Sequence, residues 1–137
     1  MQKITAKSIT NYEQLVQGFS QNKSWDAQYR LIIQLGKQLD SLPDALKVPE
    51  NEVQGCESLA WLVMIPKGPY IDLQMDSDTR VVKGLMKIIS IIFQDKTPQQ
   101  IRDINCEALF SELGLLNHLS PSRTNGLFSI IKKIQAV

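Results

Sequence analysis

The stretch Val53–Met64, which reads VQGCESLAWLVM, changes from polar to apolar around a glycine–cysteine pair. Gly55 can adopt backbone angles that are closed to other residues, and it adds no side chain beside the thiol of Cys56. The run from Leu59 to Ile65 is apolar at both alternating sets of positions. This favours a strand buried on both sides, although a buried helical segment has the same appearance. We therefore expect Cys56 at the tip of a loop that enters a rigid strand, a common way to hold a reactive group.

The residues that follow this strand predict a hairpin and then a central helix. Pro66–Pro69 is typical of a hairpin turn, and Tyr70–Met75 alternates between apolar and polar residues, as a half-buried antiparallel strand does. Asp76–Asp78 offers side chains that could cap the next helix. That helix, to about Gln94, is apolar apart from one polar stripe, so we expect it to contact both the sheet and other helices.

The N-terminal part predicts two helices and the approach to the cysteine. Thr10–Glu13 has the capping-box pattern and opens a short helix to about Phe19, whereas residues 1–9 show no periodicity and are expected to form a loose lead-in. Ser24 can cap a second helix that runs to about Gly36. The pattern also allows a short edge strand at Glu52–Gln54.

The C-terminal part predicts three further helices, each with a recognisable start. Thr97–Gln100 is a capping box with proline at the first helical position, and Asn105 can cap a helix from Cys106 that ends at Gly114. Ser120-Pro121 opens the last helix. Its predicted inner face is formed by Leu127, Ile130, Ile131 and Ile134.

The order of these elements predicts an α+β fold, with a small antiparallel β-sheet packed against several α-helices. The length of 137 residues fits a single domain covering 1–137. The net charge of +1 argues against a general nucleic-acid-binding protein. The N-terminus has no apolar signal segment, and no apolar run approaches the ~18 residues of a membrane span, so we expect a cytoplasmic protein.

The two cysteines and the single histidine limit the chemistry. Cys56 and Cys106 are fifty positions apart in a chain without a visible signal sequence, which favours free thiols in a reducing compartment over a disulfide. A zinc site needs about four clustered ligands, so no metal is expected. From residue types alone, Cys56 is about equally well interpreted as a buried structural cysteine or a reactive one. His118 lies among apolar residues and is more typical of a partly buried structural group than of a catalytic base.

The pattern V-x-G-C-E-S-x-x-W-L-V, from Val53 to Val63, resembles the acceptor-cysteine motif of the SufE family, the sulfur-acceptor partners of cysteine desulfurases. Ala60 stands where the family usually has an apolar residue before Trp61. Further matches span about residues 24 to 128, and Met75 replaces a usual glycine within them. The matching segments are Trp25–Arg30, Leu35–Leu39, Asp76–Leu85 and Leu119–Leu127. Glu57 and the segment Ala108–Leu115 are similar to the CsdE branch.

The resemblance implies that Cys56 accepts persulfide sulfur by transpersulfuration and passes it on for iron–sulfur cluster assembly. It implies a SufE/IscU-like fold, and a carrier and activator rather than an enzyme. The implied partner is a PLP-dependent cysteine desulfurase, SufS-like or CsdA-like, with a downstream scaffold or other sulfur-receiving protein. No cofactor of its own is implied. Arg123, Asp76 and Asp78 match family positions, but the resemblance gives them no role here.

Two other classes of function stay open at this point. A stand-alone thiol redox enzyme would need a resolving cysteine or an activating group near Cys56, and an iron–sulfur scaffold would need several ligands at one site. For the acceptor, we expect Cys56 to be sheltered at rest, with Gly55 as a hinge. Leu59 and Trp61 are the predicted floor of its pocket.

Overall fold

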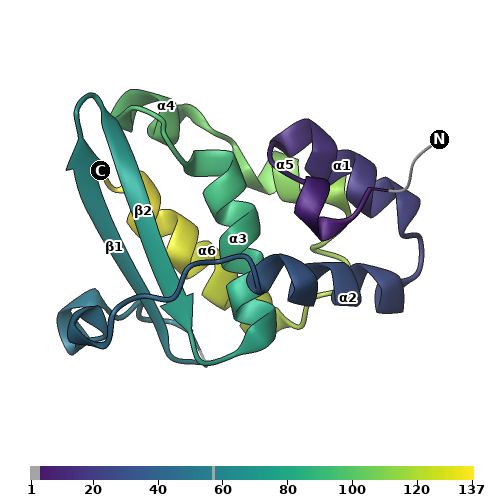
Figure 1. Cartoon of the computed structure of the whole chain (residues 1–137), viewed down its shortest axis with the longest axis horizontal. Coiled ribbons are helices and arrows are strands. Elements are labelled where there is room, and N and C mark those ends of the chain that lie inside the picture. Colours follow the sequence, from purple (N-terminus) through teal and green to yellow (C-terminus); the bar gives the residue numbers. More distant parts are fainter. Residues whose placement is uncertain (1–3, 57) are drawn as a thin grey trace.

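The computed structural model describes residues 4–56 and 58–137, which form an α+β fold (Figure 1). Within these residues a two-stranded antiparallel sheet lies at one end, with helices behind and beside it. The helices are α1 (Tyr12–Gln21), α2 (Trp25–Gly36), α3 (Arg80–Phe93), α4 (Pro98–Asp103), α5 (Cys106–Leu113) and α6 (Pro121–Gln135), and the strands are β1 (Ala60–Lys67) and β2 (Tyr70–Ser77). Short 3-10 helices cover Ala6–Ser8, Asp44–Leu46 and Pro49–Asn51.

Most helices begin at the predicted caps. The side chains of Ser24, Asn105 and Ser120 each accept a hydrogen bond from a backbone N–H in the first turn, and Thr97 forms the predicted capping box. The prediction for α1 was off by one residue, because Asn11 is the cap and accepts from the N–H of Gln14.

The predicted cap of α3 is wrong. Its N-cap is Thr79, whose side chain makes no capping hydrogen bond, and Asp76 belongs to β2 instead. Asp78 accepts a hydrogen bond from the Thr79 hydroxyl at 3.1 Å.

The hairpin agrees with the prediction, but the burial of its first strand does not. β1 pairs with β2 from Ala60↔Ser77 to Lys67↔Tyr70, so the turn is shorter than Pro66–Pro69. Ile65 is 38% exposed and Leu59, just before the strand, is 48% exposed. A two-stranded sheet leaves part of one face uncovered, so β1 is buried mainly on the side that faces the helices. Instead of an edge strand at residues 52–54, only Glu52 forms an isolated bridge, with Trp61.

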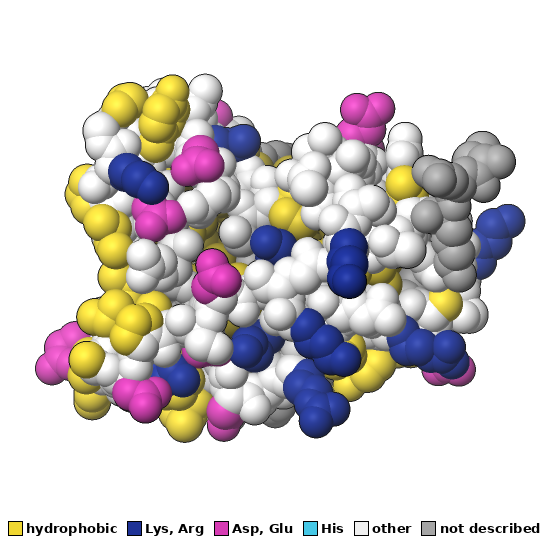
Figure 2. Space-filling model, in the orientation of Figure 1, with side chains coloured by type: hydrophobic (Ala, Val, Ile, Leu, Met, Phe, Trp, Pro, Cys, Tyr) yellow, Lys and Arg dark blue, Asp and Glu magenta, His cyan; other side chains and the backbone are white. Residues whose placement is uncertain are grey.

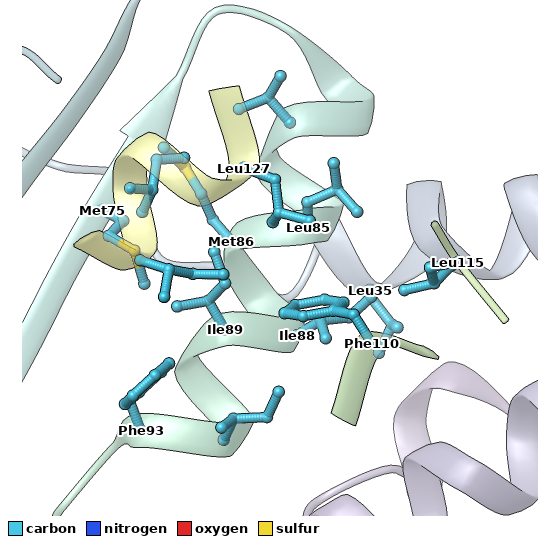
Figure 3. Packing of buried hydrophobic residues seen from close by; sticks show 14 of the residues in the cluster. Leu35, Met75, Leu85, Met86, Ile88, Ile89, Phe93, Phe110, Leu115 and Leu127 are labelled. Carbon is cyan, nitrogen blue, oxygen red and sulfur yellow. The ribbon is translucent and has the colours of Figure 1, made fainter. Parts of the chain in front are cut away.

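Helix α3 is the centre of the hydrophobic core, as its composition predicted. Its buried side chains pack against α2, β2 and α6 (Figure 3). The crossing with α2 is very close: a Cβ atom on Gly36 would lie 2.7 Å from the backbone N of Gly84. The inner face of α6 is the predicted one, since Leu127, Ile130, Ile131 and Ile134 are all buried.

The N-terminal segment is packed rather than loose from residue 4 onward. Ala6 and Ile9 are buried in the core cluster, and the N–H of Ile4 donates to Oε1 of Gln21 at 2.6 Å. The sequence did not predict this packing, because two apolar side chains are enough to dock a short 3-10 turn but too few to show a periodic pattern. Residues 1–3 of that prediction lie outside the described residues.

The surface charge is unevenly distributed despite a net charge of only +1. Figure 2 shows Lys and Arg side chains gathered across the lower centre of one face, over the region of α2 and the start of α3 in Figure 1. Hydrophobic and acidic side chains gather instead on the side of the hairpin. In the described part of the chain, none of the helices combines the length and the apolar character needed to cross a bilayer.

Candidate functional site

The loop that carries Cys56 is fixed at both ends. At its start, Val53 is buried and its N–H donates to the carbonyl of Ala60 at 2.8 Å. At its end, the Ser77 hydroxyl donates to the carbonyl of Leu59 at 2.6 Å. Gly55 has a φ of +94°, in the region that favours glycine, so the chain can turn sharply just before the thiol. Glu57 lies outside the described residues.

Cys56 is half-buried against the N-terminal half of α6. Its Sγ donates a weak hydrogen bond to the carbonyl of Gly126 at 3.4 Å. Beside it is a cavity of about 20 Å³, room for about one water molecule. The cavity is lined by Cys56, Ser58, Val82, Leu85, Ser122, Arg123, Gly126, Leu127 and Ile130.

The walls of this cavity come mainly from two helices that are distant in sequence. Val82 and Leu85 belong to α3, and Leu127 and Ile130 belong to α6. Figure 3 shows Leu85 and Leu127 lying next to one another. The prediction that Leu59 and Trp61 form the floor is wrong. Leu59 is exposed, and the Trp61 ring lies 5.5 Å from the ammonium group of Lys47.

Burial and charge act on the Cys56 thiol in opposite directions. Burial raises the pKa of Cys56 above its ordinary value, and the positive charge of Arg123 opposes part of that increase. Burial outweighs the charge, so this position favours the protonated thiol.

Arg123 thus lines the same cavity as the thiol, a placement for which the sequence offers no reason beyond the family pattern. Ser120 caps α6 through the N–H of Arg123, which places this arginine in the first turn. Capping chemistry predicts that placement. It does not predict which loop the first turn of α6 faces, because this depends on tertiary packing.

Asp76 and Asp78 do not line the cavity, and Asp76 has a structural environment of its own. Asp76 is 2% exposed, and its carboxylate accepts hydrogen bonds from the N–H groups of Leu42 and Ser77 at 3.0 and 2.8 Å. Lys47 and Lys83 lie 3.3 and 3.6 Å from its oxygens. Burial alone would raise the pKa of Asp76, but these donors and cations together lower it below its ordinary value.

The single histidine and the other cysteine do not line the cavity beside Cys56. His118 is exposed rather than partly buried, and its ring stacks on Trp25 with centroids 4.7 Å apart. Cys106 is 4% exposed and faces the core, and burial raises its pKa to about 12. Both cysteines are free. Within residues 4–56 and 58–137, no group of three or more His, Cys, Asp or Glu side chains could hold a metal ion.

The comparisons with known proteins agree with this architecture. The family model "SufE: Fe-S metabolism associated domain" matches residues 13–137. An uncharacterized SufE-like protein of Rhizobium meliloti is 36% identical over 132 residues, covering 93% of this chain and 94% of that protein. The solution structure of a hypothetical protein from Thermus thermophilus shares the fold at a TM-score of 0.73 and 14% identity, over 91% of this chain and 90% of that one. The chain therefore belongs to the SufE family, which is associated with iron–sulfur metabolism.

Proposed function

We propose that this protein accepts sulfur from a PLP-dependent cysteine desulfurase on Cys56, activates that enzyme, and passes the sulfur on for iron–sulfur cluster assembly. The observation that carries the proposal is one half-buried thiol, on a loop fixed at both ends, beside a cavity with room for about one small group. In this proposal the whole chain, 1–137, acts as one domain in the cytoplasm. Membership of the SufE family supports this role.

The transfer requires little catalytic machinery from the acceptor. The Cys56 thiolate attacks the outer sulfur of the persulfide on the desulfurase, R–S–SH, so that a bond forms between Cys56 and that sulfur. The S–S bond of the donor breaks and the desulfurase cysteine leaves as a thiolate. Cys56 then carries –S–SH, and no external oxidant or reductant is consumed. The removal of sulfur from cysteine belongs to the partner.

The cavity suits the product of this step. A persulfide extends beyond Sγ by one sulfur atom, and the space of about 20 Å³ is of that order. The aliphatic side chains of Val82, Leu85 and Leu127 form its walls. They would keep water and competing thiols away from a reactive sulfur.

The thiol has to leave this position to meet the active site of a desulfurase. A partner can draw it out only by binding the exposed form more tightly than the sheltered form. If the exposed form is a few per cent populated, the binding penalty is about 2 kcal/mol, which a modest interface can offset.

The test is to incubate the protein with a desulfurase and cysteine and to measure the adduct on each cysteine peptide by mass spectrometry. We expect an addition of about 32 Da, one sulfur atom, on Cys56. Cys56→Ser should abolish both the adduct and the stimulation of the desulfurase. Cys106→Ser, the matched control, should preserve both. Full stimulation by Cys56→Ser would disprove the proposal.

Two measurements separate this function from the other two classes. A thiol peroxidase would consume peroxide with turnover, whereas the proposed acceptor should not. A cluster scaffold would carry iron in freshly purified protein and lose it in Cys56→Ser. We expect neither metal nor cofactor to accompany the protein at stoichiometric amounts.

A further inference from the structure

Helix α6 holds the segment before and at the thiol through one row of residues. Gly126, Ser129 and Lys133 are three and four positions apart, a spacing that places them on the same face of a helix. Each contacts a different point of the segment from Glu52 to Cys56. The row therefore runs alongside the segment from its base at Glu52 to its tip at Gly55 and Cys56.

At the tip, the thiol packs against the bare backbone of Gly126. A Cβ atom at this position would lie 3.6 Å from the Cα of Cys56 and 3.3 Å from its Sγ, and the second distance is closer than side chains normally approach. The missing side chain is thus what lets the sulfur reach the helix and its carbonyl. The weak Sγ–H hydrogen bond to Gly126 is the one hydrogen bond between tip and helix among the described residues.

In the middle of the row, Ser129 packs under Gly55. A Cβ atom on Gly55 would lie 2.5 Å from Ser129 Oγ. The serine hydroxyl donates to the carbonyl of Asn125 at 2.9 Å, back into its own helix. Ser129 therefore offers the loop a small, closely fitting surface, and its hydroxyl is already engaged.

At the base, Lys133 makes a polar contact instead. Its ammonium group donates to the carbonyl of Glu52 at 3.3 Å, next to Val53, whose N–H is bonded to Ala60. A hydrogen bond from a charged donor is about twice as strong as a neutral one. The base is thus bonded to α6, whereas the tip is mainly packed against it.

We propose that Gly126, Ser129 and Lys133 are positioning residues that set the resting place of Cys56. Lys133 fixes the base of the loop, and Gly126 with Ser129 form a shallow seat from which the tip can leave without breaking strong bonds. The use of this seat in sulfur transfer rests on the proposed function. The position of the thiol itself does not depend on that function.

The seat is tested by filling it from the helix side, without changing the loop. In Ser129→Leu the larger side chain occupies the place of Gly55, so the tip is displaced. We expect the rate of Cys56 alkylation by iodoacetamide to rise about tenfold, as the exposed fraction rises from a few per cent to a few tens of per cent. Hydrogen exchange at residues 54–56 should accelerate, while exchange at Val53 stays slow.

Two variants serve as controls for this result, and a third replaces Ser129→Leu if that variant does not fold. Ser129→Ala fits the seat and should label slowly, like the natural protein. Ser111→Leu makes the same substitution at an exposed position of α5 and should also label slowly. If Ser129→Leu fails to fold, as judged by its circular dichroism and melting temperature, Ser129→Gln fills the seat with a side chain that tolerates water. The proposal is overturned if a folded variant with a larger side chain at position 129 shows the same rate of Cys56 alkylation as the natural protein.

The base is tested by a pair of adjacent lysines. Lys133→Met removes the bond to Glu52, whereas Lys132→Met removes the same charge from an exposed position of α6. We expect faster exchange at the Val53 N–H in Lys133→Met alone, and equal exchange in the two variants would overturn the role of Lys133. No desulfurase is present in any of these measurements. A seat that behaves as expected in a protein that accepts no sulfur would therefore refute the proposed function and leave the seat intact.

Discussion

Arg123 is the charged side chain that acts on the Cys56 thiol, against the larger effect of burial. Burial in the cavity raises the pKa of Cys56, and the guanidinium group counteracts part of this. A residue that favours the thiolate without taking a proton is useful to an acceptor, because the reacting species is the thiolate.

We predict that Arg123→Gln raises the pKa of Cys56 further. Loss of the positive charge disfavours the thiolate, so the pH profile of Cys56 alkylation should move to higher pH. The profile should be measured over the range from mildly acidic to strongly basic pH, with Arg123→Lys as the matched variant that keeps the charge. A profile that shifts equally in both variants, or in neither, would contradict an electrostatic role.

At this scale the sequence predicted which cysteine lies on the loop before the strand, but it did not predict the surroundings of that cysteine. Cys56 and Arg123 both belong to recognisable local patterns. Val82 and Leu85 lie in an apolar helix in which every inward position looks alike. They line the cavity because α3 packs against α6. The spacing of residues within either helix does not predict that packing.

Among the elements, the strand β2 carries the clearest discrepancy between local pattern and structure. Asp76 has the residue type of a helix cap, yet it lies within the strand and joins β2 to the segment that contains Leu42 and Lys47. Caps such as Ser24 and Thr97 were predicted correctly because their partners are three residues away. The principal partners of Asp76 include Leu42, which is thirty-four positions away.

We predict that Asp76→Asn lowers the free energy of unfolding at neutral pH by about 1–3 kcal/mol, the usual cost of weakening buried hydrogen bonds to a charged group. Because folding lowers the pKa of Asp76, its contribution is complete above the ordinary value of 3.8 and is lost as the pH falls through the lower, folded value. Urea unfolding measured from neutral to strongly acidic pH should thus show a smaller acid loss in the variant.

The control for this prediction is Asp78→Asn, two residues away and exposed. Its stability should remain within about 0.5 kcal/mol of the natural protein, as for most surface substitutions. Equal losses in the two variants would mean that the buried network around Asp76 contributes little.

For the whole molecule, the two cysteines should report two different motions. Cys106, the first residue of α5, is buried in the core, and its raised pKa keeps the thiol protonated in the folded protein. Cys56 is on a surface loop. Local opening exposes a loop at much lower free energy than the global unfolding that exposes a core.

We predict that Cys106 is alkylated only through global unfolding. Its labelling rate should rise with urea as steeply as the unfolding equilibrium, whereas the Cys56 rate should hardly depend on low urea concentrations. The measurement is peptide mass spectrometry of both thiols over a urea series below the unfolding midpoint. Cys106 labelling that is fast and independent of urea would contradict it.

The order of elements was sufficient to predict the α+β fold of the whole chain. Hydrophobic periods and caps are local, so α2, α4, α5 and α6 could be placed from the sequence. The docking of residues 4–9 and the exposure of Ile65 could not be, because both depend on which parts of the core are left uncovered by other elements. The same limit applies to the seat on α6, whose members look like ordinary small or polar helix residues.

The close crossing of α2 and α3 also restricts how far related sequences can diverge. At Gly36 and Gly84 the two backbones touch, and a methyl group at either position would force the helices apart. Helix α3 also carries Val82 and Leu85, so wider spacing would shift a wall of the cavity beside Cys56. If the proposed sulfur transfer is correct, a substitution at either glycine would therefore affect that transfer as well as folding. Among relatives that keep this crossing, we expect both glycines to persist even where most of the surrounding core has been exchanged.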